Sequence, residues 1–281
     1  MSESIVSTMR PASIAAEQPA RAPSRRARAL RSLVLLLALL GLAACAHAPA
    51  HAPPRNPMAQ WVPSPNLDQR RPSLIVLHAT HQHSVQASLD TLRTRNSGGR
   101  VSAHYLVGRA GDLYQLVADQ DRAWHAGAGR WGTITEVNSA SIGIELDNDG
   151  SADFTPAQMT SLLRLLTDLT GRLGIAPTQV VGHSDFAPTR KRDPGPQFPW
   201  KQLADAGFGI WPADDAPPAP AGFDPWLALA AIGYPLEDRA AAVRAFHHRF
   251  RGMESELLDD EDLRILHALT RLPPQALPTA D

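Results

Sequence analysis

The 281-residue chain contains one cysteine and two lysines, and beyond residue 44 it has no excess of positive charge. A single cysteine excludes an intramolecular disulfide and a zinc site made of several thiolates, so a metal here needs histidine and carboxylate ligands. The first 44 residues hold six arginines and two glutamates, which leaves 21 basic and 26 acidic residues in the remainder. A chain with that balance lacks the clustered positive charge that binds phosphates, so nucleic acid is excluded as a partner.

The apolar run at residues 33–40 is too short to span a bilayer as a stable helix. Arginines precede it and small residues follow it, which is typical of an export signal that is removed. The motif LAAC at residues 42–45 resembles the lipobox of bacterial lipoproteins, in which the cysteine is acylated and becomes the mature N-terminus. A conventional cleavage site with a chance cysteine is the alternative.

The residue after the lipobox bears on where the protein resides. Ala46, rather than an aspartate, follows Cys45, and this resembles lipoproteins that are sorted to an outer membrane. Acyl chains on Cys45 hold a protein firmly at a membrane surface. We therefore expect a lipid-anchored protein on the periplasmic face of the outer membrane.

Composition divides the rest of the chain into folded and unfolded stretches. Residues 45–70 are rich in alanine, proline and histidine and are expected to form a tether, and residues 213–222 are a second, proline-rich linker. Between them, residues 71–212 alternate apolar strand patterns with helical ones, which predicts an α/β domain. Residues 223–281 show only helical spacing and predict a small domain of short helices.

Several elements of the α/β domain are readable from the pattern alone. Residues 74–77 form a continuous apolar run that ends at His78, as expected of a buried strand. In residues 141–147 the apolar residues alternate, which places Glu145 on the face opposite the aliphatic side chains. The other expected elements are a helix behind Ser84, a hairpin from 105–107 and 113–117, a helix with a capping-box pattern from Thr155 to Gly174, and a short strand at 180–181.

Residues 182–196 are the strongest candidate for a metal site. A zinc hydrolase holds its ion with three protein groups and leaves one position for water. The segment follows a strand, is stiffened by prolines, and carries His183 and Asp193 where a loop can bring both to one ion. Among the eleven histidines, His81 and His83 are rival ligands if their segment is helical, but the preceding strand and Ser84 favour a loop there.

The segment 182–196 resembles the zinc loop of the N-acetylmuramoyl-L-alanine amidases, and the resemblance extends over most of residues 71–212. It implies a central mixed β-sheet flanked by helices. It also implies a Zn²⁺ ion held by His78 at the end of the first core strand, His183 after the late strand, and Asp193 ten positions further on.

The resemblance also assigns roles to other residues. Glu145 matches the glutamate that takes a proton from the attacking water and passes it to the leaving nitrogen, and Lys191 matches the residue that stabilises the oxyanion. Lys191 is one of only two lysines against 25 arginines, which suggests a need for a compact point charge. Trp124 and His125 resemble a substrate-contacting loop.

The implied activity is zinc-dependent hydrolysis of the amide bond between the lactyl group of N-acetylmuramic acid and the L-alanine of the stem peptide. The implied partners are peptidoglycan or muropeptides. One alternative is a non-catalytic wall receptor, which is expected to lack at least one of His78, His183 and Asp193, whereas all three are present. The other alternative is a zinc peptidase that cuts within the stem peptide.

The C-terminal residues 223–281 resemble a three-helix peptidoglycan-binding module found beside many wall hydrolases. Apolar residues share one face of a helix that includes Phe246, and Asp259 caps the next helix. Two positions depart from the module's pattern, because His247 replaces a glutamine and Asp262 replaces a threonine. The alternative is a helical appendage that serves only packing.

Overall fold

The structure is a computed structural model that describes residues 55–66, 68–69, 72–96 and 99–272. The described residues all belong to one compact unit. The expected signal peptide, Cys45 and the first part of the expected tether lie outside the described residues. Within those residues, no helix is both long and apolar enough to cross a membrane.

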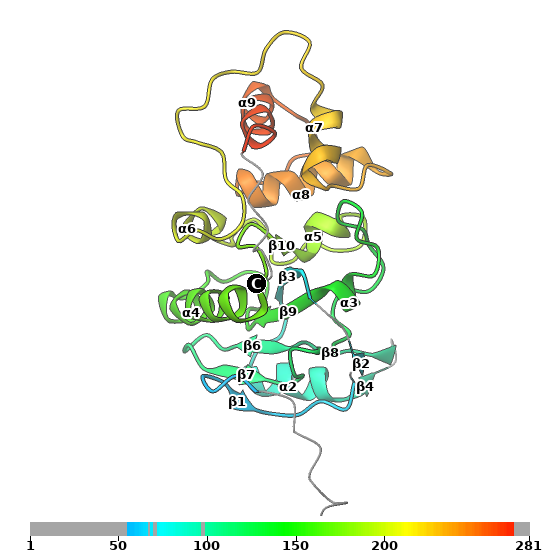
Figure 1. Ribbon diagram of the computed structural model, residues 1–281, viewed down its shortest axis with the longest axis vertical. Coiled ribbons are helices and arrows are strands. Elements are labelled where there is room, and N and C mark those ends of the chain that lie inside the picture. Colours follow the sequence, from blue (N-terminus) through cyan, green and yellow to red (C-terminus); the bar gives the residue numbers. More distant parts are fainter. Residues whose placement is uncertain (1–54, 67, 70–71, 97–98, 273–281) are drawn as a thin grey trace, which may run out of the picture. The chain divides into compact units, whose positions relative to one another are not determined.

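A six-stranded mixed sheet forms the centre of this unit (Figure 1). Its strands, in spatial order, are β1 (Gln60–Trp61), β7 (Leu113–Gln115), β6 (Tyr105–Val107), β9 (Ser141–Leu146), β3 (Leu74–Ala79) and β10 (Val180–Gly182). Strands β6 and β7 form the expected antiparallel hairpin, and the other neighbours are parallel. The predicted fold class, a mixed sheet flanked by helices, is confirmed.

One face of the sheet packs against the long helix α4 (Pro156–Leu173). The Thr155 hydroxyl accepts a hydrogen bond from the Gln158 N–H, and Gly174 ends the helix with a left-handed φ of 66°. These ends agree with the predicted ones. The capping box is incomplete, however, because the Gln158 side chain donates to the carbonyls of Val107 and Asp147 instead of returning to the cap.

The opposite face has two separate covers. Helix α2 (Val85–Arg93), capped by Ser84 as expected, packs over β6 and β7. The C-terminal helices α7 (Pro225–Ile232), α8 (Arg239–Phe250) and α9 (Asp260–Leu269) share a core with β3 and β10. The residues that join the two regions in this core include Leu74, Val76, Val181, Leu229, Val243, Phe246 and Leu266.

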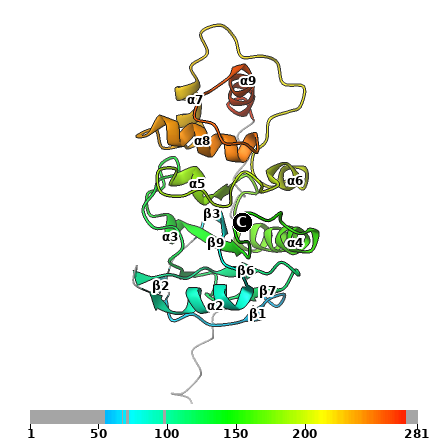
Figure 2. The ribbon, with the colours of Figure 1, turned by 180° about the vertical axis from the view of Figure 1, so that it is seen from behind.

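Helix α8 lies between two sets of neighbours (Figure 2): α5 (His183–Phe186) and α6 (Trp200–Asp205) on one side, α7 and α9 on the other. The predicted apolar face is buried, but so are His247, His248 and Arg249. The two departures from the module's pattern meet here, because His247 Nε2 lies 2.9 Å from Asp262 Oδ2. Beyond its exposed first two residues, α8 is buried on nearly all sides and therefore uses polar pairs as well as apolar contacts.

The structure corrects the expected tether at its C-terminal end. Residues 60–61 are strand β1, and residues 68–69 are β2, which pairs antiparallel with β8 (Asp121–Arg122). The Asn56 side chain is buried and donates to Asp168 in α4. Two-residue strands have no periodic apolar pattern, so composition alone assigned this stretch to a linker. The remaining short elements are β4 (Arg95–Asn96), β5 (Gly99–Arg100) and α3 (Val137–Ala140).

Candidate metal centre and active site

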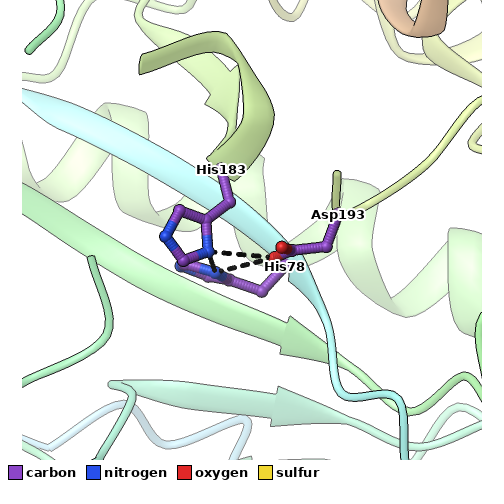
Figure 3. Close-up of side chains that lie close together, drawn as sticks. All are labelled: His78, His183 and Asp193. Carbon is purple, nitrogen blue, oxygen red and sulfur yellow. Dashed lines mark hydrogen bonds and ion pairs between the residues drawn. The ribbon is translucent and has the colours of Figure 1, made fainter. Parts of the chain in front are cut away.

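The three predicted metal ligands come together at one edge of the sheet (Figure 3). His78 lies near the end of β3, and His183 follows β10 directly, so the parallel pairing of these strands brings both histidines to the same edge. The loop after α5 brings the Asp193 carboxylate next to both histidines. His78 Nδ1 lies 2.9 Å from His183 Nδ1 and 3.2 Å from Asp193 Oδ2, and His183 Nδ1 lies 3.1 Å from the same oxygen.

The hydrogen bonds of His183 determine which ring nitrogen can bind a metal. Its Nε2 lies 2.9 Å from the carbonyl oxygen of Ala126. A carbonyl oxygen only accepts, so Nε2 must carry the proton. In the neutral ring, Nδ1 then has a free lone pair, and it points at His78 and Asp193.

A chain of three hydrogen bonds settles the same question for His78. The Ser141 hydroxyl donates its proton to the Val137 carbonyl at 2.5 Å, so Ser141 accepts from His125 Nε2 at 3.2 Å. His125 Nδ1 therefore accepts from His78 Nε2 at 3.0 Å. His78 Nδ1 is left as a lone pair, as is His183 Nδ1.

When both rings are neutral, two imidazole lone pairs and a carboxylate oxygen thus converge on one point, and their mutual repulsion is relieved by a cation at the centre. Burial, aided by His183, lowers the pKa of His78 to about 4, so the ring is in the neutral form that a metal requires. In a tetrahedral zinc site, ligands at about 2.0–2.1 Å from the ion lie about 3.3 Å apart, close to the observed separations. The residues present fit a zinc ion.

The rival histidines do not join this group. Residues 80–84 form a loop rather than a helix, as expected from Ser84 and the preceding strand. His83 is exposed, and His81, with a left-handed φ of 50°, lies against Gly150. Within the part of the chain that the structure describes, His78, His183 and Asp193 are the only such cluster of potential ligands.

The predicted proton carrier and cation stand beside the ligands. Glu145 in β9 is the direct register partner of His78 in β3, so the two side chains project from the same face of the sheet. Both Glu145 and Lys191 line a cavity of about 260 Å³ together with the three ligands. Burial raises the pKa of Glu145 to about 8, with a further rise from Asp193 and an opposing effect of Lys191.

His125, expected to contact substrate, lies mostly behind the ligands. Its side chain is 8% exposed, reaches the cavity wall, and bonds to His78 and Ser141. Gly143 makes room for it, because a Cβ at that position would lie 2.4 Å from the His125 ring. The geometry gives His125 a role in orienting His78, and contact with substrate stays a prediction.

Trp124 also has internal partners. The guanidinium groups of Arg100 and Arg122 lie 4.1 Å and 4.3 Å from its ring centroid. Such cation–π contacts occupy the indole faces that would otherwise stack on a sugar. A contact between Trp124 and substrate therefore stays a prediction as well.

Sequence reasoning missed Ser141, Gly143 and the carbonyl of Ala126. The alternation along β9 places Ser141 and Gly143 on the same face as Glu145, and this was visible in the pattern. Which groups oppose that face was not visible, because His125 and Ala126 reach it from a loop. The signal available was a serine and a glycine where a buried strand face normally carries aliphatic side chains.

Comparison with known proteins agrees with this site. A profile of the N-acetylmuramoyl-L-alanine amidases matches residues 68–196, which span all three ligands. The chain is 38% identical over 213 residues to the N-acetylmuramoyl-L-alanine amidase AmiD of Escherichia coli strain K12, an alignment that covers 64% of this chain and 75% of AmiD. This chain belongs to the N-acetylmuramoyl-L-alanine amidase family. The predictions of the family and of the enzyme class are confirmed.

Solved structures extend the likeness of this amidase beyond the profile match. The E. coli AmiD structure, in complex with the substrate anhydro-N-acetylmuramic acid-L-Ala-D-γ-Glu-L-Lys, matches with a TM-score of 0.64 at 35% identity and covers 72% of this chain and 89% of that chain. AmpDh3 from Pseudomonas aeruginosa, in complex with anhydromuramic pentapeptide, matches with a TM-score of 0.63 at 33% identity, over 77% of this chain and 97% of the other.

Proposed function

We propose that this amidase is a zinc enzyme that hydrolyses the amide bond between the lactyl group of N-acetylmuramic acid and the L-alanine of the stem peptide. The convergence of three proton-free ligand atoms next to Glu145 carries this proposal. The muropeptides bound to AmiD and AmpDh3 support the choice of substrate, and anhydro-muropeptides are therefore candidates as well.

The residues around the ligands have separate roles in the proposed reaction. A bound Zn²⁺ ion supplies a Lewis acid that polarises a carbonyl and lowers the pKa of water. Glu145, beside His78, accepts the proton of the attacking water and then donates it to the leaving amide nitrogen. The ammonium group of Lys191, on the cavity wall, stabilises the negative charge that develops on the carbonyl oxygen.

Mass spectrometry of digested substrate tests this function. Purified murein and soluble anhydro-muropeptides are each incubated with the enzyme, with and without a chelator. We expect free peptides that begin with alanine, no product with the chelator, and recovery when zinc is added back. Fragments cut inside the stem peptide would identify a peptidase, and a lack of any fragment would favour a receptor.

For the N-terminal region we propose an exported lipoprotein in which residues 1–44 are removed and Cys45 is acylated. The motif at residues 42–45 and the following Ala46 support an anchor on the periplasmic face of the outer membrane. Cell fractionation of a Cys45→Ser variant tests this. We expect the wild type in the outer-membrane fraction and the variant no longer attached to membrane.

For residues 223–281 we propose peptidoglycan binding, on the resemblance to a wall-binding module. Sedimentation of the inactive Glu145→Ala protein with insoluble murein tests it. Binding that survives an excess of soluble anhydro-muropeptide would indicate a second contact outside the catalytic cavity, and binding that is abolished would favour the packing role.

A further inference from the structure

The segment 183–193, which carries His183 and Asp193 and is called the metal loop here, holds a buried carboxylate that the proposed chemistry does not use. Asp185 lies in α5, two residues after His183, and is 1% exposed. Its Oδ2 accepts the Gly182 N–H at 2.8 Å, which closes the turn that presents His183. A buried carboxylate is costly unless it is paired, so its partners show what stabilises this turn.

Both remaining partners of Asp185 come from the C-terminal helical region. Arg249 of α8 donates to Oδ2 at 2.7 Å, and the Tyr234 hydroxyl donates to Oδ1 at 2.8 Å. Arg249 is itself 3% exposed and also donates to the Val180 carbonyl in β10 at 3.0 Å. One guanidinium therefore joins the strand before His183 to the helix turn after it.

Other contacts from α8 follow the same loop toward the third ligand. Arg244 donates to the Pro188 carbonyl at 3.0 Å, and His248 Nδ1 donates to the Arg192 carbonyl at 3.3 Å, next to Asp193. The loop that carries two of the three ligands is thus held at several points by one helix. Wall binding alone does not explain why a buried ion pair, Arg249–Asp185, joins these helices to the loop that carries the ligands.

We propose that the C-terminal helices are part of the metal site, with Arg249 and Tyr234 as positioning residues that hold the loop 183–193 so that His183 and Asp193 face His78. This inference rests on the proposed metal-dependent function. Partners that orient metal ligands from outside typically change metal affinity when they are removed. Neither residue lines the catalytic cavity, so substrate binding does not depend on them directly.

Zinc affinity of the full-length protein tests the proposal. The dissociation constant for zinc is measured by competition with a chromogenic chelator for the wild type, Arg249→Met, Arg249→Lys and Tyr234→Phe. We expect Arg249→Met to raise it roughly 10- to 100-fold and Tyr234→Phe to raise it less. Arg249→Lys keeps the charge and should recover part of the affinity. With zinc at saturation, KM should stay at the wild-type value.

A matched control separates this role from general destabilisation. Arg239 lies exposed on the same helix and stacks on Trp226, so Arg239→Met should leave the zinc dissociation constant unchanged. Wild-type zinc affinity in Arg249→Met and Tyr234→Phe, or an equal loss in Arg239→Met, would overturn the inference and leave the proposed function standing. Failure of the wild type to bind zinc would instead overturn the proposed function.

Arg249→Met removes a buried charge partner, so a variant that does not fold is a foreseeable result. In that case Tyr234→Phe and Arg249→Lys decide the matter, because each keeps the volume and the charge balance of the site. Zinc dissociation constants above the wild-type value in both support the inference. Wild-type values in both contradict it.

Discussion

The two faces of the central sheet are built from the same strands but have different roles. On one face, Ile75, Ile142 and Ile144 lie under a single long helix, α4, and the packing is mainly apolar. On the other face, the row that begins with Leu74 and Val76 ends in His78, and the neighbouring row ends in Glu145. Alternation along a strand thus separates a purely structural face from a chemical one.

The covers of the two faces differ in the same way. Helix α4 is one continuous cover, whereas the second face is covered by α2 over β6 and β7 and by the C-terminal helices over β3 and β10. The catalytic cavity is lined from this second face and from the metal loop. The active site therefore forms where the sheet face carries polar side chains. The helices beside it bury the rest of that face from solvent.

The largest expected effect comes from removing the proton carrier on the chemical face. Glu145→Gln should lower kcat by about 10²- to 10⁴-fold, since a positioned acid–base group contributes that much. Zinc affinity should change little, because Glu145 is not among the ligands. Steady-state kinetics on anhydro-muropeptides, with zinc titration alongside, measure both. Near-normal turnover would remove Glu145 from the mechanism.

Truncating a large side chain in a covering helix on each face tests whether both covers unfold together with the central sheet. Phe246→Ala in α8 should destabilise the protein by about 3–5 kcal/mol, and Leu166→Ala in α4 by about 2–5 kcal/mol. Because Phe246 shares a core with β3, both variants should unfold in one transition, followed by circular dichroism in denaturant. A separate early transition of the C-terminal helices in Phe246→Ala, with the catalytic part still folded, would refute a shared core.

A smaller effect is expected from the hydrogen-bond chain behind His78. Ser141→Ala removes the acceptor that keeps the His125 proton on Nε2, so His78 loses part of its orientation. The zinc dissociation constant should rise about tenfold, at the lower end for groups that orient a ligand. Imidazole nitrogen chemical shifts report the ring tautomers directly. Unchanged shifts and affinity would show that the chain does not set them.

The smallest effect concerns the His247–Asp262 pair among the C-terminal helices. Burial lowers the pKa of His247, but Asp262 and the Ser255 carbonyl outweigh it, so the pKa lies above 6.5. The pair's contribution to stability is therefore complete below pH 6.5 and is lost as pH rises through the raised pKa.

His247→Gln should abolish this pH dependence. Melting temperatures of the wild type and the variant are compared at about pH 6 and about pH 8.5, with a larger difference expected at the lower value. Arg239→Met, which changes an exposed group of the same helix, serves as the control. A difference that is equal at both values would mean that His247 does not carry the charge.

Local rules predicted the elements whose ends are marked by capping residues or by a continuous apolar run. Ser84, Thr155 and Gly174 act within a few residues of themselves, and β3 is buried on both faces. The same rules failed for β1, because a two-residue edge strand has no period. They predicted α8 and its apolar face but not the burial of its polar side, which is covered by a second region of the chain.

The sequence by itself determined the α/β class and most helix ends, because these follow from short-range patterns, and its resemblance to the amidase family pointed to His78, His183, Asp193 and Glu145. Only the tertiary structure decided which ring nitrogens of His78 and His183 face Asp193, where His125 lies, and that Arg249 meets Asp185. Those contacts join positions far apart along the chain, and their geometry exists only once parallel strands and the C-terminal helices have packed together.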